Sequence, residues 1–597
     1  MQEQDLATMA HDAAKNGPPM GGPPPEEAPV VAEPHEPIHD DCDIVVLGGG
    51  GAGLVAAARI SETTDKKVIV VEKRKNFGGG AMGAADWRVY GSRWQREHGI
   101  PDNTLPALRQ VMDETFWELS PALAYNTFRA TGEFFDFLCD TGEGVEELYQ
   151  EGTYIFDGPD GPKIPAFKKE RQGGAYVMKR MIALCEKNGV TMLKNTAVTD
   201  IDHENGIYTV SAKDPGGETV ITAKACILAT GSWIRNHALV EKYVPKIADY
   251  PMGNGGHTHP SYTGDAVALA EKLGAFVDYD SFEIRLMGPL GMCPSQTLMS
   301  MAAEPSTLWV NKNGKRWINE STQKRRGIFE TGNRLAEQPD YQSFYLFDQG
   351  MLEACVKAYA DGKRQPWCFP APPSYGENWQ EDVENAFSPK KGGGMPPMPG
   401  MGKSIARADT LEELAAEMGI NPENLKATVA HYNEMCRQGI DTEYFKDPGE
   451  MIPFTKAPYY MVSGGMGTDG AFGGVLVNEN IQATAKNGGL IDGLYVPGDF
   501  SSGRFLNIRN NKVQITNDLS WAFASGWIAG GSAVAALDSR PKMERIFIRS
   551  IFIALSAGHH GASFSRTPWR TNRAPSKSSL QVDRVTICTG PVTVSSH

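Results

Sequence analysis

One segment near the N-terminus limits the possible folds more than any other. The apolar run Asp43–Leu47 leads directly into GGGGAG, and a helical pattern begins within these glycines. Gly48, Gly50 and Gly53 have the spacing G-x-G-x-x-G. When a buried strand enters a helix through such a turn, the first N–H groups of the helix point at one place where an anion can bind. The segment therefore predicts the first strand, turn and helix of an α/β fold with a phosphate site.

The next apolar strand ends in an acidic residue. KKVIVVEKR reaches Glu72, 19 residues after Gly53, and Lys73 follows it. In a dinucleotide-binding βαβ unit, an acid at this place accepts hydrogen bonds from the hydroxyl groups of a ribose. Together with the glycine turn, Glu72 predicts a Rossmann-like site for NAD or FAD.

Three later segments decide between these cofactors. They are NFGGGAMGAADW after Lys73, the strand-like AKACILATGSW at 223–233, and GGLIDGLYVPGDFSSG at 488–503. This order, with TGDAVALAEKLGA and WVNKNGKRWINE between the last two, resembles a superfamily of FAD proteins with two dinucleotide folds. That superfamily includes fumarate reductase, succinate dehydrogenase and L-aspartate oxidase flavoproteins and 3-ketosteroid dehydrogenases. The resemblance covers roughly residues 42–537 and implies FAD as the cofactor.

The resemblance also implies an architecture. We expect an α/β fold in which a Rossmann-like FAD-binding domain of the two-dinucleotide-fold type, over 42–275 and 456–537, carries an inserted α+β capping domain over 276–455. Residues 1–41 are rich in Pro, Gly and Glu and predict a flexible arm. Residues 538–597 contain nine Lys and Arg against three Asp and Glu, and predict a basic, disordered tail.

Hydrophobic periodicity outlines the secondary structure. It predicts helices over 106–139, 175–188, 262–275 and 518–537, and strands over 190–200, 207–213 and 219–229. The Asn-Gly pair inside WVNKNGKRWINE predicts a turn between two strands.

Specific residues follow from the resemblance. The glycine turn would bind the pyrophosphate, Glu72 the adenosine ribose, and Val198 the adenine through its backbone. Asp499 would accept hydrogen bonds from the ribityl hydroxyls. Trp87 either forms a wall for an aromatic or polycyclic substrate or packs between flavin and cap. The implied cofactor-binding residues are Gly48, Gly50, Gly51, Ala52, Gly53, Glu72, Lys73, Gly79, Gly80, Ala81, Asp86, Trp87, Val198, Thr230, Gly231, Asp265 and Asp499.

The substrate end departs from the fumarate reductase pattern. The stretches that clamp two carboxylates in that family lack their histidines here and read FEIRLMGPLGMCP and SGGMGTDGAFGG. A C4-dicarboxylate is therefore not the expected substrate. Hydride transfer from flavin to a C=C bond needs a proton donor on the opposite face and a cation or hydroxyl at the activating carbonyl. The catalytic candidates are Arg509, Arg504, Tyr460, Arg325 and Lys324.

Three functions stay open from the sequence. The first is an FAD-dependent ene-reductase that acts on an enone or enoate. The second is the reverse reaction, a 3-ketosteroid-type dehydrogenase. The third is a non-catalytic electron-transfer flavoprotein, which a large capping segment argues against because a cap encloses a substrate pocket. We expect a small unsaturated substrate and a separate electron donor.

Composition excludes other classes of protein. A net charge of −14 argues against nucleic acid as a partner. The nine cysteines include no C-x-x-C pair, so no metal site is indicated. No apolar run reaches the ~18–20 residues of a transmembrane helix. The N-terminus has no signal-peptide pattern, which predicts a cytoplasmic protein, or an exported one if a leader has been removed.

Overall fold

In the computed structural model, the predicted strand and helix on either side of the glycine turn both form. The structure describes residues 32–540 except 85–86, 116, 143–144, 146–148, 151–165, 168–172, 251–260, 292, 294, 303, 323–327, 364–374, 389–402 and 504–517. The predicted tail therefore lies almost entirely outside the described residues. Within the described ranges, no helix has both the length and the apolar character needed to cross a membrane.

The first sheet has eight strands and a parallel core. Its strands are β15 (Gln482–Thr484), β16 (Leu490–Tyr495), β9 (Glu218–Leu228), β1 (Ile38–Leu47), β2 (Val68–Val71) and β6 (Thr191–Leu193) in this order, with β7 (Ala197–Glu204) and β8 (Ile207–Lys213) continuing antiparallel from β9. β1 lies between β2 and β9 and is parallel to both. Val68–Val71 and residues 44–47 are buried, as expected for parallel strands that are covered on both faces. The glycine turn thus leaves the sheet at the carboxyl end of β1, its central strand.

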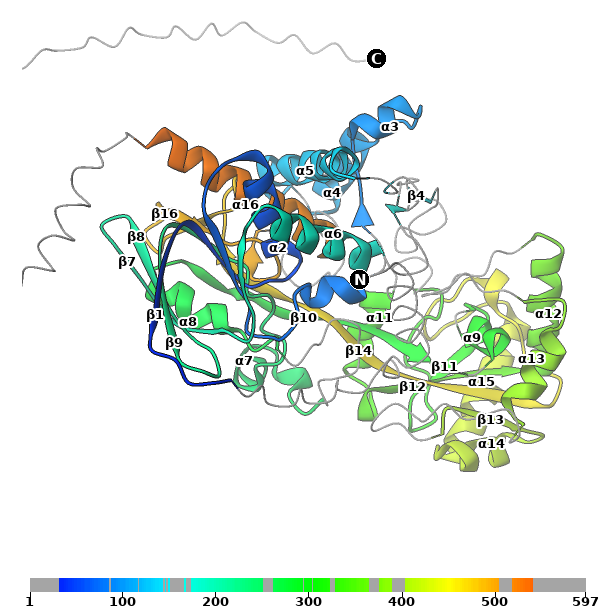
Figure 1. The fold of residues 1–597 in the computed structure, drawn as a ribbon. Coiled ribbons are helices and arrows are strands. Elements are labelled where there is room, and N and C mark those ends of the chain that lie inside the picture. Colours follow the sequence, from blue (N-terminus) through cyan, green and yellow to red (C-terminus); the bar gives the residue numbers. More distant parts are fainter. Residues whose placement is uncertain are drawn as a thin grey trace, which may run out of the picture. The chain divides into compact units, whose positions relative to one another are not determined.

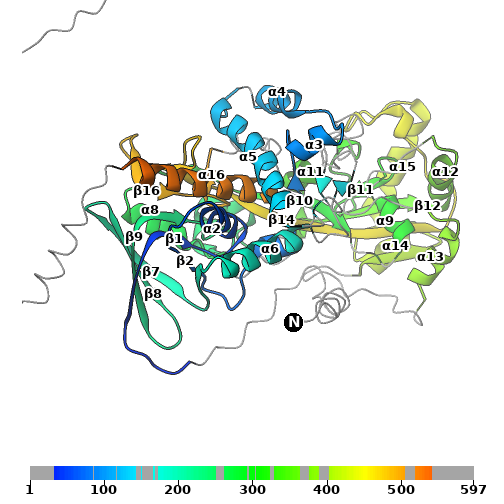
Figure 2. The ribbon, with the colours of Figure 1, turned by 45° about the horizontal axis from the view of Figure 1, so that its top comes forward.

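Eight helices are described outside the second sheet, and all but α3 and α7 lie close to predicted positions. They are α2 (Gly51–Thr63), α3 (Arg93–Glu97), α4 (Thr104–Glu114), α5 (Pro121–Asp140), α6 (Gly173–Lys187), α7 (His237–Tyr243), α8 (Asp265–Lys272) and α16 (Asp518–Ser539). α2 and α16 lie side by side, although they come from opposite ends of the described chain (Figure 2). Glycine permits this approach, because a Cβ atom on Gly526 would lie 2.2 Å from the carbonyl oxygen of Ala52.

A second sheet is antiparallel and carries the middle of the chain. Its strands are β10 (Val277–Gly291), β11 (Leu308–Val310), β12 (Gln342–Asp348), β13 (Ile405–Ala408), β14 (Tyr459–Leu476) and β17 (Ser501–Ser502), of which β17 alone pairs in parallel. Around it lie α9 (Gln296–Ala302), α11 (Ile328–Leu335), α12 (Gln349–Ala360), α13 (Trp379–Ala386), α14 (Leu411–Met418) and α15 (Pro422–Gln438). A small third sheet joins β3 (Trp87–Arg88), β4 (Tyr149–Gln150) and β5 (Ala166–Phe167). β14 is the long strand that pairs at its start with β12 and β13 and at its end with β10 and β17 (Figure 1).

Three boundaries differ from the prediction. β1 begins at Ile38, inside the predicted arm, because Ile38–Asp41 pair with β9. The predicted strand 190–200 is divided into β6 and β7, since Asn195 takes φ +54° and turns the chain. The helical pattern 106–139 is divided into α4 and α5 around Trp117, whose φ is +60°. Periodicity records which side chains are apolar, and such local turns leave little trace in it.

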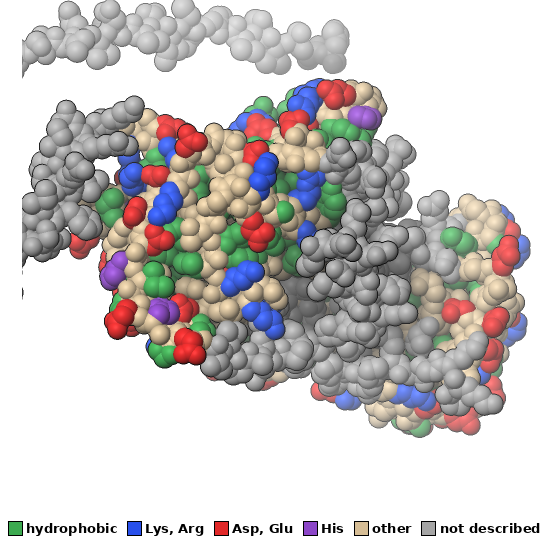
Figure 3. Space-filling model, viewed as in Figure 1, with side chains coloured by type: hydrophobic (Ala, Val, Ile, Leu, Met, Phe, Trp, Pro, Cys, Tyr) green, Lys and Arg blue, Asp and Glu red, His purple; other side chains and the backbone are tan. Residues whose placement is uncertain are grey.

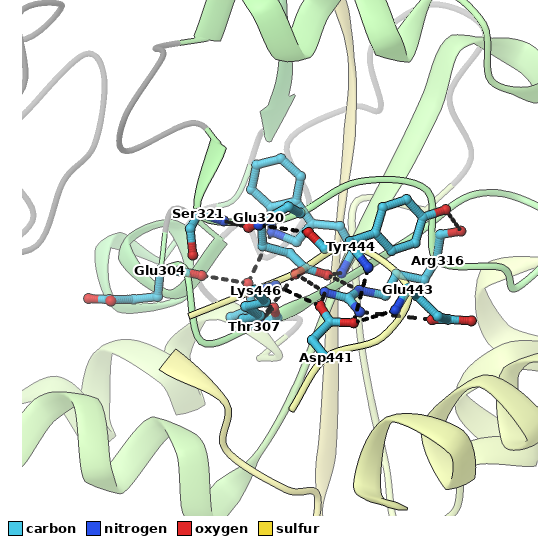
Figure 4. Close-up of polar contacts among 11 residues, drawn as sticks. Glu304, Thr307, Arg316, Glu320, Ser321, Asp441, Glu443, Tyr444 and Lys446 are labelled. Carbon is cyan, nitrogen blue, oxygen red and sulfur yellow. Dashed lines mark hydrogen bonds and ion pairs between the residues drawn. The ribbon is translucent and has the colours of Figure 1, made fainter. Parts of the chain in front are cut away.

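The Asn-Gly turn forms as predicted and leads into a buried cluster of charges. Gly314 takes φ +71°, and Val310 and Arg316 form a bridge across the turn. Arg316 donates to Glu320 at 2.8 and 2.9 Å and to Asp441 at 2.7 Å (Figure 4). Lys446 lies 3.3 Å from Glu320 and donates to the carbonyl of Thr307 at 2.9 Å. The cluster therefore joins the turn after β11 to the segment that follows α15.

The four charges compensate one another out of contact with water. The exposed fraction of each of these side chains is 2% or less. Burial alone would raise the pKa of Asp441, but Arg316 and the backbone N–H groups of Lys446 and Tyr444 outweigh it and lower the pKa to about 2. Burial lowers the pKa of Lys446, which the neighbouring Glu320 partly opposes. These two cations and two carboxylates therefore hold together the region around β11, which we call the outer end of the second sheet.

The surface carries both signs of charge. On the face shown in Figure 3, Lys and Arg side chains alternate with Asp and Glu over the described residues. The described part of that face shows no basic stripe of the kind that phosphate backbones require.

Removing Arg316 tests the structural role of the buried cluster. We expect Arg316→Met to lower the free energy of unfolding by about 3–5 kcal/mol, because it leaves the buried carboxylates without their main partner. Lys357→Gln is the control, since it breaks the exposed pair between Lys357 of α12 and Asp361, just after that helix. It should lower the free energy of unfolding by less than about 1 kcal/mol. Urea denaturation followed by tryptophan fluorescence measures both, and equal effects of the two variants would contradict the assignment.

Candidate functional site

Three glycines form the turn after β1, and two of them, Gly48 and Gly53, are required by close contacts. Gly48 takes φ +108°, and a Cβ atom there would lie 2.3 Å from the carbonyl oxygen of Ala229. A Cβ atom on Gly53 would lie 2.0 Å from the carbonyl oxygen of Gly48, so only glycine lets α2 start this close to β1. A Cβ atom on Gly50 would meet nothing within 4 Å. The first turn of α2, whose N–H groups have no partner inside the helix, therefore begins beside open space.

That space is part of a cavity at the carboxyl edge of the first sheet. Its wall is formed by the glycine turn between β1 and α2, the ends of β2 and β9, the turn Gly79–Gly83, and the starts of β7 and α8. Residues before and within α16 complete the wall. The lining residues are Gly48, Gly50, Gly51, Ala52, Val71, Glu72, Lys73, Arg74, Gly79, Gly80, Ala81, Ala84, Thr196, Val198, Ala229, Thr230, Gly231, Ser261, Tyr262, Asp265, Leu269, Gly498, Asp499, Asp518, Leu519 and Ala522. Of the predicted cofactor-binding residues, all but Gly53, Asp86 and Trp87 lie on this wall.

Glu72 is held in place at the end of β2. Its carboxylate accepts hydrogen bonds from the backbone N–H groups of Gly49, at 2.8 Å, and Arg74, at 2.9 Å. A carboxylate has about four lone-pair directions, so two oriented donors leave it able to accept more from a ligand. Next to it, Lys73 donates to Asp265 at 2.6 Å, which joins two of the predicted residues across the cavity wall.

Tyr262 is a wall residue that sequence reasoning missed. A Cβ atom on Gly80 would lie 2.0 Å from its hydroxyl oxygen, so Gly80 has to be glycine for the ring to fit. Burial raises the pKa of Tyr262, and the charge of Asp499 raises it further. The residue directly precedes TGDAVALAEKLGA, so its nearness to a recognised motif was the available signal.

A second missed feature lies at the start of α16. Asp518 lines the cavity and forms an ion pair with Arg285 of β10. The sequence predicts a helix from Asp518 but assigns no role to the acid in its first turn. Arg285 belongs to FEIRLMGPLGMCP, a stretch that stands out in the sequence only because it lacks histidine.

Trp87 packs in the core and is not a wall residue of the cavity. Its side chain is fully buried, and its ring centroid lies 5.6 Å from that of Phe523 and 5.8 Å from those of Phe134 and Phe135. These neighbours belong to α5 and α16, outside the predicted cap at 276–455, so the observed packing differs from both predicted alternatives. Its neighbour Asp86 lies outside the described residues.

Tyr460 lies far from the cavity. It stands at the start of β14 and donates to the side-chain oxygen of Gln349 at 2.7 Å, with its ring stacked on Phe347. The cavity lies near the other end of this strand, where Val475 donates to the carbonyl of Phe500. Ten residues of strand, at most about 33 Å, separate Tyr460 from Gly470, which lies beside Asp518 on the cavity wall. This position argues against the predicted role of Tyr460 as a proton donor at the flavin.

The other catalytic candidates belong to segments that the structure leaves undescribed. Lys324 and Arg325 fall within 323–327, and Arg504 and Arg509 fall within 504–517. Their roles remain predictions from the sequence.

A family model described as an FAD binding domain matches residues 43–505, which is most of the chain. The chain belongs to this family. FAD is therefore its cofactor, as the sequence predicts.

Named relatives and a solved structure agree with the family. A 3-oxosteroid 1-dehydrogenase of Mycobacterium tuberculosis is 27% identical over 53% of this chain and 55% of its own length. A vinyl phenol reductase of Lactiplantibacillus plantarum is 26% identical over 55% of this chain and 65% of its own length. The chain thus spans between half and two thirds of these relatives. The open conformation of a flavocytochrome c3 fumarate reductase has a similar fold, with a TM-score of 0.59 at 20% identity over 90% of this chain and 81% of that one.

The cavity wall fits FAD by its own chemistry. A cradle of glycine backbone at the start of α2 suits a pyrophosphate, and the oriented carboxylate of Glu72 suits a ribose. The hydroxyl oxygen of Thr230 is buried in the wall and has no hydrogen-bond partner among the described residues. A polar atom in that position is satisfied when a ligand with polar groups occupies the cavity.

Gly50 allows a direct test of the cofactor position. Because its Cβ direction is empty in the protein itself, Gly50→Ala should fold normally but place a methyl group where the pyrophosphate would lie. We expect FAD affinity to fall about tenfold or more, which corresponds to ~1.4 kcal/mol. Absorbance of the flavin retained after dialysis, with fluorescence titration of added FAD, measures the loss.

Two other glycines supply the comparison. Gly376→Ala, also without neighbours at its Cβ position, should leave FAD affinity unchanged. Gly53→Ala should disturb folding itself because of the clash with Gly48. If Gly50→Ala binds FAD as tightly as the wild type, the proposed pyrophosphate position is wrong.

Proposed function

We propose that the protein is an FAD-dependent oxidoreductase of CH–CH bonds that reduces an activated C=C bond, as in an enone or enoate. The observation that carries the proposal is that the FAD cavity ends against the second sheet, where Arg285 of β10 reaches Asp518 on the cavity wall. A substrate between the two sheets would therefore lie beside the cofactor. The relative called vinyl phenol reductase is named for a compound whose C=C bond is conjugated with an aromatic ring.

The finer architecture belongs to this proposal. We take residues 42–275 and 456–537 as an FAD-binding domain of the two-dinucleotide-fold type and 276–455 as its cap. Support comes from β10 and β14, which pair along the region where the predicted domains meet. α11 packs tightly on β10, because a Cβ atom on Gly332 would lie 2.5 Å from the carbonyl carbon of Leu286. Lys324 and Arg325 directly precede α11 in the sequence.

The chain has two tasks beside the cofactor. Bound FAD supplies hydride transfer at N5. Protein groups must deliver a proton to the neighbouring carbon of the alkene and hold its activating carbonyl. Because Tyr460 is not part of the cavity wall, we take Arg509, Arg504, Arg325 and Lys324 as the candidates. Electrons would come from a separate donor.

The reverse reaction is the second candidate. A 3-ketosteroid-type dehydrogenase would use the same cavity in the oxidative direction, and the relative named 3-oxosteroid 1-dehydrogenase favours it. Direction depends on the reduction potential of the flavin and on the electron partner, and both reactions require the same placement of cofactor and substrate.

An anaerobic titration distinguishes the two directions. We expect the flavin of reduced, FAD-loaded protein to reoxidise on addition of an enone or enoate, with recovery of its visible absorbance. Quinones or protein acceptors should not replace the alkene. Bleaching of the oxidised protein by a saturated 3-ketosteroid, with no response to alkenes, would support the dehydrogenase instead.

Two substitutions test the proton donor. Arg509→Ala should lower the rate of alkene-dependent reoxidation by about 10²-fold or more, in line with the usual contribution of a general acid. Tyr460→Phe should leave the rate unchanged, because its hydroxyl bonds Gln349 far from the cavity. Full turnover in Arg509→Ala would move the role to Arg504, Arg325 or Lys324, and a large loss in Tyr460→Phe would contradict the fold-based exclusion.

A further inference from the structure

The ion pair between Asp518 and Arg285 joins the first turn of α16 to the second sheet. Asp518 is the first residue of α16, and it lines the cavity. Arg285 reaches it from β10, and the two side chains expose 5% (Arg285) and 20% (Asp518) of their surface. Across the ladder β10 pairs with β14, and a Cβ atom on Gly470 of β14 would lie 3.9 Å from the Asp518 carboxylate. The pair therefore sits where the FAD-binding sheet and the second sheet meet.

The course of α16 shows which end of the cavity the pair occupies. Ala522 lies next to Gly51 at the start of α2, and Gly526 and Gly530 lie next to Ala52 and Ala56 further along that helix. Going back one turn from Ala522 to Asp518 moves about 6 Å beyond the glycine turn. Glu72 and Val198 mark the adenosine end of the cavity in the proposed binding mode. Asp518 lies on the opposite side of the pyrophosphate cradle, at the isoalloxazine end.

Charges in this position act strongly on a redox cofactor. Reduction of a flavin adds negative charge to its ring system, so a nearby cation stabilises the reduced form and a nearby carboxylate opposes it. Because the pair is largely shielded from water, these interactions are stronger than on the surface. The positive end of the α16 dipole also lies at Asp518, where it favours the ionised carboxylate.

We propose that Asp518 and Arg285 form a charge pair at the isoalloxazine end of the cavity that sets the reduction potential of the bound FAD. Asp518 lowers the potential and Arg285 raises it, so that the balance between them fixes which direction of the reaction is favoured. This assignment rests on the proposed position of FAD in the cavity. Both residues would act on the flavin through their charge, and neither has to exchange a proton or hydride.

A structural pin between two sheets is the competing explanation. A pin would also be weakened by either substitution, but both losses would act in the same direction, as poorer FAD retention or lower stability. A charge pair at the flavin instead predicts shifts of the potential with opposite signs. The sign of the shift is therefore the readout that separates the two.

Potentials of the FAD-loaded variants test the proposal. They are measured at fixed pH and ionic strength against reference dyes during slow enzymatic reduction. Asp518→Asn should raise the potential, Arg285→Gln should lower it, and the double variant should return it towards the wild-type value. Asp518→Glu, which keeps the charge, should shift it least among the changes at 518. Lys246→Gln is the control, because Lys246 pairs with Glu283, on the same strand as Arg285 but away from the cavity wall, and should not shift the potential.

The outcome is decisive in each case. An unchanged potential in Asp518→Asn with FAD bound, or shifts of the same sign in both single variants, overturns the proposal. If Arg285→Gln does not fold, the comparison of Asp518→Asn with Asp518→Glu still decides it. The measurement of the reduction potential needs no substrate. If the alkene titration fails but the two single variants shift the potential in opposite directions, the proposed substrate is wrong and the proposed charge pair stands. A successful titration without shifts would remove the charge pair alone.

Discussion

The close contact between α2 and α16 is the interaction on which the cavity depends. Two helices from opposite ends of the described chain approach until their backbones meet. Glycine is needed at 526 and 530, because a Cβ atom there would lie 2.2 Å and 2.9 Å from the carbonyl oxygens of Ala52 and Ala56. With larger side chains, the helices would separate and the first turn of α16 would leave the wall. Small residues at this interface thus place Asp518–Ala522 beside the glycine turn, although no local interaction connects the two segments.

A second constraint comes from β14. This one strand pairs with β12 and β13 at its start and with β10 and β17 at its end, so it belongs to the outer and the inner part of the second sheet at once. Its inner end is hydrogen-bonded to Phe500, next to Asp499, which fixes how the second sheet meets the cavity. The buried charges around Arg316 hold the outer end of the same sheet. The inner end of β14 therefore fixes how the second sheet meets the cavity, while a separate cluster of buried charges stabilises the region around β11.

Much of the cofactor site could be predicted from the sequence because its parts are local. A buried strand, a glycine turn and a helix have a recognisable pattern, and Glu72 follows at a fixed spacing. The predicted ribose, pyrophosphate and ribityl residues accordingly lie around one cavity. The division of 190–200 by Asn195 was not predictable in the same way, yet it is what brings Thr196 and Val198 to the wall.

The sequence by itself determined the order of the elements, since strand and helix periodicity and turn glycines act over a few residues. The resemblance of its motifs to a known superfamily implied the family and the cofactor. Only the tertiary structure decided the neighbours at the far end of the cavity. It moved Tyr460 away to the start of β14, buried Trp87 among Phe134, Phe135 and Phe523, and brought Arg285 to Asp518. Contacts between residues hundreds of positions apart arise from packing of whole elements, and a linear pattern of residues does not contain them.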